Sequence, residues 1–153
     1  MKQNHFTSTG LVFNENREIL MIKHKKQGLW LPPGGHVDEN ELPCKAVVRE
    51  VFEETNIVVQ VLSSVPGLDL SEKAQKELPL PLRIIYVDGA GHIDLLYLCR
   101  AVNIDYIPNK NEIDGIGWFS PEEAMKLDTY EEYIKSIESV ISIHKLSLYS
   151  KTC

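Results

Sequence analysis

Three glutamates lie close together in the segment REVFEETNI at 49–57, namely Glu50, Glu53 and Glu54. On an α-helix, residues three and four positions apart share one face, so the three carboxylates would lie side by side. Because like charges at this spacing destabilise a helix, a group outside the helix is expected to offset the repulsion. A divalent cation is the first candidate. Taken alone, the triplet also suits an acidic helix face in contact with solvent.

The residues around the three glutamates predict a helix from about Pro43 to Thr55. Proline suits the first helical position, since its missing N–H would have no partner there. At helical spacing the stripe expected to face the core is Cys44, Val47, Val48, Val51 and Thr55. The glutamates lie on a separate face, where Arg49 can reach Glu53 one turn later.

The loop before this helix, PPGGHVDENE, contains Gly34 and Gly35. Because glycine has no Cβ, it lets a backbone carbonyl approach a ligand or a metal ion closely. The loop and the helix together therefore bring a backbone oxygen and several carboxylates within one short stretch of sequence. These are the hard oxygen ligands that Mg²⁺ prefers.

Read from Gly35, the chain gives five residues, Glu41, seven residues, and then Arg49-Glu50-Val51-Phe52-Glu53-Glu54-Thr55-Asn56-Ile57. This spacing resembles the Nudix box, G-x5-E-x7-R-E-U-x-E-E-x-G-U, where U is a bulky apolar residue. Every defined position matches except the final glycine, which is Asn56. Asparagine commonly replaces glycine in the left-handed conformation just past a helix, so Asn56 is expected to keep the turn.

The resemblance implies a Mg²⁺- or Mn²⁺-dependent hydrolase that cleaves a diphosphate linked to another group, usually a nucleoside. It implies that Glu50, Glu53, Glu54 and the Gly34 carbonyl bind the metal, with Glu112 on a later loop as a further ligand. Arg49 would orient the glutamates, Glu41 would brace the junction between loop and helix, and Gly35 and Asn56 would be structural. Glu50 and Glu112 are both candidates for the general base.

The resemblance implies a small-molecule nucleotide as the substrate, with a nucleoside triphosphate or a nucleoside diphosphate derivative as the expected class. Residues outside the box should line its pocket, and the candidates are Tyr86, His92, Asp94 and the loop at 67–82. Strand alternation sends His92 and Asp94 to the same side, where they could face a polar cleft. A surface pair is an equally good interpretation. Nothing in the sequence assigns the base.

The remaining segments predict a single α/β domain over residues 1–153, of the Nudix α/β/α sandwich type with a mixed sheet. Strands are predicted for the apolar runs TGLVF, EILMIKH, IVVQVLSSV, LRIIYVD, HIDLLYLCRAV and IGWF. SPEEAMKL should open a helix capped by Ser120, and a last helix is predicted for about 130–144. GLWLPPGGHVDENE is predicted to be a loop.

Charge and cysteine content exclude some classes of function. The net charge of −6 argues against a large nucleic-acid surface, and no apolar run is long enough to span a membrane. The start of the chain does not resemble a signal peptide. Three widely spaced cysteines, Cys44, Cys99 and Cys153, suggest reduced thiols in the cytoplasm, two of them buried and one in a tail.

Two alternatives to the hydrolase stay open. One is a nucleotide-sensing module without catalysis, although the carboxylates of the box are all present. The other is an isomerase on the same fold that acts on isopentenyl diphosphate, a reaction that needs a cysteine near the metal. Neither Cys44, on the core stripe, nor Cys99, within a strand, is well placed for it. Oligomeric state is not readable from the sequence.

Overall fold

The computed structural model describes residues 3–63, 76–142, 149–150 and 153. Its strands are β1 (His5–Phe13), β2 (Ile19–His24), β3 (Trp30–Leu31), β4 (Gly34–His36), β5 (Val59–Ser63), β6 (Arg83–Val87), β7 (His92–Ala101), β8 (Ile113–Phe119) and β9 (Tyr149–Ser150). Its helices are α1 (Pro43–Thr55), α2 (Pro121–Ala124) and α3 (Glu131–Ser142). None of the described helices is both long enough and apolar enough to cross a bilayer.

The sheet is mixed, as predicted. β1 runs parallel to β7 over its whole length, from His5 opposite His92 to Phe13 opposite Arg100. The other pairs are antiparallel, and the main strand order is β3-β2-β1-β7-β5-β9. β4, β6 and β8 add to β1, β7 and β2, respectively. Two strands far apart in sequence therefore form the centre of the sheet.

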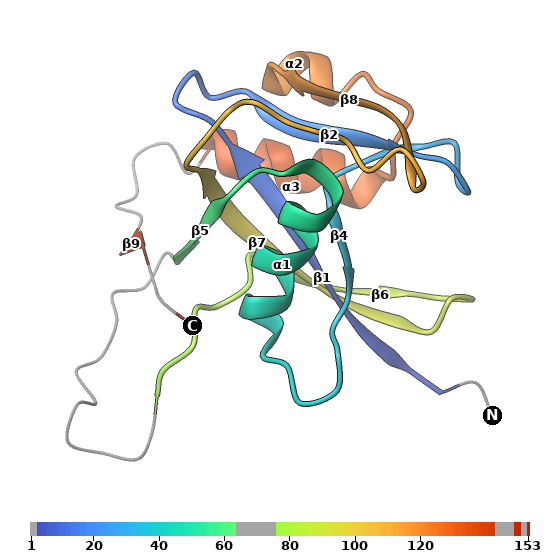
Figure 1. Ribbon diagram of the computed structural model, residues 1–153, viewed down its shortest axis with the longest axis vertical. Helices are drawn as coiled ribbons and strands as arrows, with labels where there is room; N and C mark the ends of the chain where they lie inside the picture. The colour runs from blue at the N-terminus through green and yellow to red at the C-terminus, as the bar shows by residue number, and fades with distance from the viewer. Residues whose placement is uncertain (1–2, 64–75, 143–148, 151–152) are drawn as a thin grey trace.

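The helices cover opposite faces of the sheet, with α1 on one side and α3 on the other (Figure 1). Val12, Tyr97 and Cys99 point to the α1 side, where they pack with Val47 and Val51. Alternate residues such as Leu11 and Leu96 point to the α3 side and pack with Ile137. The predicted α/β/α sandwich is confirmed.

Helix α1 spans the predicted residues and buries Cys44, Val47, Val51 and Thr55, with Val48 partly buried. Leu42 stands at the N-cap without a side-chain hydrogen bond, and Pro43 follows it. Asn56 ends the helix with φ 61° and ψ 16°, the left-handed conformation expected of the residue that replaces the glycine.

The predicted loop at 28–41 is partly wrong, because it contains β3 and β4. Gly34, Gly35 and His36 pair with Thr9, Ser8 and Thr7 of β1. Two glycines have a low intrinsic strand propensity, so only the pairing partner makes this segment a strand. The helix predicted for SPEEAMKL is a single turn, capped by Ser120 and Glu123 as a capping box. Residues 64–65, 67–75 and 143–144 of the predicted elements lie outside the described residues.

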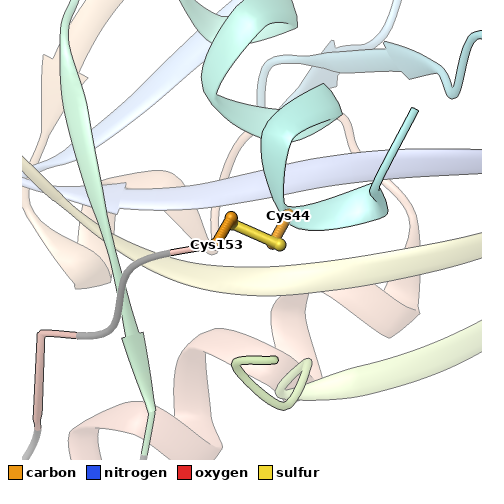
Figure 2. Close-up of a disulfide and its surroundings, with 2 residues drawn as sticks. All are labelled: Cys44 and Cys153. Carbon is orange, nitrogen blue, oxygen red and sulfur yellow. A yellow bond between two sulfur atoms is a disulfide. The ribbon is translucent and has the colours of Figure 1, made fainter. Parts of the chain in front are cut away.

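The prediction of three reduced cysteines is wrong for two of them. Cys44, in the first turn of α1, forms a disulfide with Cys153, and their Cα atoms are 5.9 Å apart (Figure 2). Spacing along the chain could not reveal this pair, because 109 positions separate its members. Cys99 is free and fully buried, as predicted. Cysteine content therefore no longer supports the expectation of a reducing compartment.

Candidate active site

Arg49 is the centre of the polar contacts on the acidic face of α1. Its Nε and Nη2 donate to the two carboxylate oxygens of Glu41 at 2.8 and 2.9 Å. Its Nη1 donates to Glu50 at 2.8 Å and to Glu53 at 3.1 Å, and Nη2 also donates to the His36 carbonyl at 2.9 Å. The paired guanidinium lowers the pKa of Glu41, which also accepts from the Asp38 N–H. One cation thus holds three carboxylates and the end of β4 in place.

Glu50 lies against the backbone of β4. A Cβ on Gly35 would lie 2.5 Å from the Glu50 carboxylate, so only glycine leaves room for this side chain. Burial raises the pKa of Glu50, Arg49 lowers it, and the charges of Glu53 and Glu112 raise it further. A carboxyl group with a raised pKa is better suited to accept a proton near neutral pH than an ordinary glutamate.

Glu54 is the most buried carboxylate of the helix, with 4% of its surface exposed. Its Oε2 accepts a hydrogen bond from the Gly34 N–H at 3.0 Å. Burial raises the pKa of Glu54 to about 8, against the effect of this hydrogen bond, and the charges of Glu50, Glu112 and Glu53 contribute to the rise. None of these contacts of Glu54 brings a positive charge to its buried carboxylate.

Glu112 reaches this cluster from a different part of the chain. It lies in the turn just before β8, where its carbonyl accepts from the Lys25 N–H at 3.0 Å. Its charge raises the pKa of both Glu50 and Glu54, so the four acids form one electrostatic unit. We refer to Glu50, Glu53, Glu54 and Glu112 as the acidic cluster.

The carboxylate oxygens of the acidic cluster suit a hard divalent cation, which binds carboxylate and carbonyl oxygens. In the described part of the chain, no three His, Cys, Asp or Glu side chains are gathered as a ready set of ligands. Glu50 and Glu53 are turned to Arg49, and Glu54 is turned to Gly34. Burial raises the pKa values of Glu50 and Glu54, and the charges of the neighbouring carboxylates raise them further. A bound cation would offset both effects, so the residues fit the metal that the sequence predicts.

The second predicted group, around Asp94, lies on the α3 side of the sheet. Asp94 is 3% exposed, so the interpretation as a surface pair is wrong. Its Oδ1 accepts from the hydroxyls of Thr7 at 2.7 Å and Thr9 at 2.8 Å. His92 is partly exposed, and its ring meets that of His36 edge to face with centroids 4.9 Å apart.

Tyr86 is separated from this group. It pairs with Ile93 across β6 and β7, so its side chain lies on the face opposite to His92 and Asp94, and it is 58% exposed. Sequence reasoning missed Thr7 and Thr9, whose alternation in HFTSTG was the available signal. It also missed Tyr133 of α3, which interacts with Thr9. Burial raises the pKa of Tyr133, and the charge of Asp94 raises it further.

A cavity of about 740 Å³ lies elsewhere, at the carboxyl ends of β1 and β7. Phe13, Arg17, Leu82, Arg100, Pro121 and Val140 are among its lining residues. No member of the acidic cluster lines it. This cavity is therefore separate from the carboxylates to which the sequence assigns the predicted chemistry.

The fold and the site define an α/β/α sandwich with a carboxylate cluster on one helix, joined to a glycine-rich strand. The sequence matches the NUDIX domain over residues 4–140, and the chain belongs to this family.

Individual proteins resemble the chain to different extents. A hydrolase of the NUDIX family from Clostridium perfringens has a TM-score of 0.75 and 27% identity, covering 93% of this chain and 99% of that one. An Ap4A hydrolase from C. elegans, with a TM-score of 0.69 over 90% of this chain and 97% of that one, is 18% identical and shows the fold alone. A Bacillus subtilis protein, whose name proposes 8-oxo-dGTP diphosphatase activity, is 49% identical over 45 residues, 29% of this chain and 30% of that protein. The chain spans 34% and 41% of two further curated relatives.

Proposed function

We propose that the protein is a metal-dependent hydrolase that cleaves the diphosphate linkage of a nucleoside triphosphate or a nucleoside diphosphate derivative. The observation that supports this most strongly is the acidic cluster itself. The charges of Glu53, on the same helix, and of Glu112, on a distant turn, raise the pKa values of both Glu50 and Glu54, and Glu54 accepts a hydrogen bond from the Gly34 backbone. Such mutual repulsion destabilises a fold unless a bound group offsets it.

The ligands of the metal would be Glu50, Glu53, Glu54 and Glu112, with the carbonyl of Gly34. When bound, Mg²⁺ or Mn²⁺ polarises phosphoryl oxygens and lowers the pKa of a bound water. A cation would also let an acidic protein, with a net charge of −6, bind an anionic diphosphate.

The protein's own residues would position and deprotonate the attacking water. Arg49 would act as a positioning residue, because its polar contacts with the described residues go to glutamates, to Asp38 and to the β4 backbone. The proton of the water would pass to Glu50 or to Glu112. Glu50 is the more buried of these two side chains, and burial raises its pKa, whereas Glu112 is exposed. Separate Glu50→Gln and Glu112→Gln variants decide between them, since loss of the general base removes from the pH profile of kcat the acidic limb, over which the base loses its proton.

The names of two relatives support a nucleotide as the class of substrate. One curated relative is named for 8-oxo-dGTP and another for bis(5'-nucleosyl)-tetraphosphate, and both compounds contain phosphoanhydride linkages. An isomerase that uses a cysteine is not supported, because Cys44 is in a disulfide and Cys99 is fully buried. Tyr86, His92 and Asp94 stay candidate substrate contacts, with Tyr86 on the other face of the sheet.

The test is product release from nucleoside triphosphates, sugar nucleotides, ADP-ribose and dinucleoside polyphosphates, with Mg²⁺ or Mn²⁺ and with a chelator. Glu54→Gln should abolish metal-dependent release, because it removes a charge from the cluster while keeping an acceptor for the Gly34 N–H. Glu138→Gln, at an exposed glutamate of α3, is the matched control and should keep activity. Metal binding without release of any product would favour the nucleotide-sensing module instead.

A further inference from the structure

Asp94 is a buried carboxylate that is only half satisfied. Both hydroxyl donors, from Thr7 and Thr9, go to Oδ1. Within the described residues, Oδ2 has no hydrogen-bond partner, although Asp94 is 3% exposed. An unpaired buried polar atom costs free energy, and more so when it carries charge. The sheet therefore holds an acceptor ready for a donor that the described part of the protein does not supply.

A second unpaired buried atom lies near the start of α3. Thr129, just before α3, has a buried Oγ1 without a partner among the described residues. The neighbouring Tyr130 ring lies 6.3 Å from the Tyr133 ring, and Tyr133 interacts with Thr9 and with the charge of Asp94. Tyr133 thus connects Asp94 on the sheet with the start of α3. An unpaired carboxylate oxygen that interacts with an aromatic side chain suits a flat, polar ligand.

The register of the strands connects this junction to the acidic cluster. Thr9 is paired with Gly34 on β4, and Thr7, two residues earlier, is paired with Asp94 on β7. Asp94 is therefore two strand spacings, or roughly 10 Å along the sheet, from His36 at the end of β4, and its side chain lies on the α3 side. A nucleotide whose phosphates lie at Gly34 and the acidic cluster has a base at about this distance.

We propose that Asp94 selects the base of the substrate, and that its Oδ2 accepts a hydrogen bond from an exocyclic amino group of a nucleobase. This inference rests on the proposed function only in assuming that the phosphates occupy the acidic cluster. An ionised carboxylate can only accept, so it favours an amino group and opposes an oxo group at the same place. Burial raises the pKa of Asp94 against the opposing effects of Thr7, Thr9 and His92, and a bound N–H donor would lower this pKa towards the ionised form.

The variant that tests this is Asp94→Asn. The amide oxygen can keep the two hydroxyl donors from Thr7 and Thr9, so the amide nitrogen takes the place of Oδ2 and turns an acceptor into a donor. Binding is measured by calorimetry with Mg²⁺ for three pairs of nucleoside monophosphates, AMP with IMP, CMP with UMP, and GMP with IMP. In each pair, one member has an amino group that the other lacks. Asp88→Asn, at an exposed aspartate in the turn between β6 and β7, is the matched control.

The wild-type protein should bind the amino member of at least one pair about 10- to 100-fold more tightly. Asp94→Asn should abolish or reverse that preference, and Asp88→Asn should keep it. Thermal unfolding gives a second readout, in which Asp94→Asn should melt at the same temperature or about 2–4 °C higher, because a poorly paired buried charge is gone. A purely structural aspartate would instead melt lower when replaced.

Equal binding of both members in every pair by the wild-type protein, or an unchanged preference in Asp94→Asn, would overturn the assignment. Because the readout is binding of monophosphates, it does not depend on turnover. A failure of the hydrolase proposal would appear separately, as the lack of metal-dependent product release from the triphosphates and diphosphate derivatives.

Discussion

Replacement of Arg49 by alanine should destabilise the metal-free protein by about 2–3 kcal/mol. Removing one partner from a buried ion pair costs about 3–5 kcal/mol, whereas an exposed pair contributes about 0–1 kcal/mol. The side chain of Arg49 is 27% exposed and that of Glu41 is 16% exposed, so this site lies between the two cases. The variant leaves Glu41, Glu50 and Glu53 without the guanidinium that contacts all three.

The assay is urea unfolding in the presence of a chelator, with Lys45→Ala as the control. Lys45 is an exposed basic residue of the same helix, so its removal changes the net charge equally and should cost less than about 0.5 kcal/mol. A double-mutant cycle of Arg49→Ala with Glu41→Gln isolates the bidentate pair and should give a coupling energy of about 1–2 kcal/mol.

A loss below about 0.5 kcal/mol for Arg49→Ala, equal to that of the control, would refute the reasoning. It would mean that the guanidinium is an ordinary surface cation and does not organise the glutamates. An unfolding curve with a changed slope would instead indicate a change in the compactness of one of the two states.

Gly35→Ala should lower hydrolysis on the order of 100-fold in a steady-state assay while the melting temperature stays nearly unchanged, because its Cβ displaces only the movable end of Glu50. Gly34→Ala should lower the free energy of unfolding by about 1–3 kcal/mol in urea, since its Cβ would lie 2.5 Å from the Ser8 carbonyl oxygen; equal melting of the two variants would contradict both. Without metal, the stability of the wild-type protein should fall as pH rises from 4.5 to about 8, because the unfolded Glu54 carboxyl loses its proton first; Glu54→Gln should have a flatter profile in unfolding experiments across this range. Cys153→Ser should lower the stability of the oxidised protein by about 2–5 kcal/mol through loss of a crosslink over 109 positions, and a reducing agent should remove the difference in thermal unfolding.

The local patterns of the sequence predicted helix α1 well. Pro43 at the first position, the core stripe and a left-handed residue after Thr55 each depend on neighbouring residues alone, so α1 spans 43–55 as expected. The strands β6 and β7 were predicted as well, because their apolar runs are local patterns, and Gly89 and Gly91 take positive φ values in the turn between them.

Features that depend on distant parts of the chain could not be predicted. β4 contains two glycines and is a strand only because β1 pairs with it. Asp94 is buried because Thr7 and Thr9, on a strand far away in sequence, turn their hydroxyls to it. The disulfide between Cys44 and Cys153 likewise depends on where the tail lies rather than on any local pattern.

The central claim is that a divalent cation offsets the repulsion within the acidic cluster. Titration of Mn²⁺ followed by electron paramagnetic resonance tests it most directly, with the wild-type protein and Glu54→Gln compared at the same pH. The wild-type protein should remove free Mn²⁺ from solution, and Glu54→Gln should bind it at least about 10-fold more weakly, since a charged ligand is lost. No binding by the wild-type protein, or equal binding by the variant, would contradict the metal site and the hydrolase that depends on it.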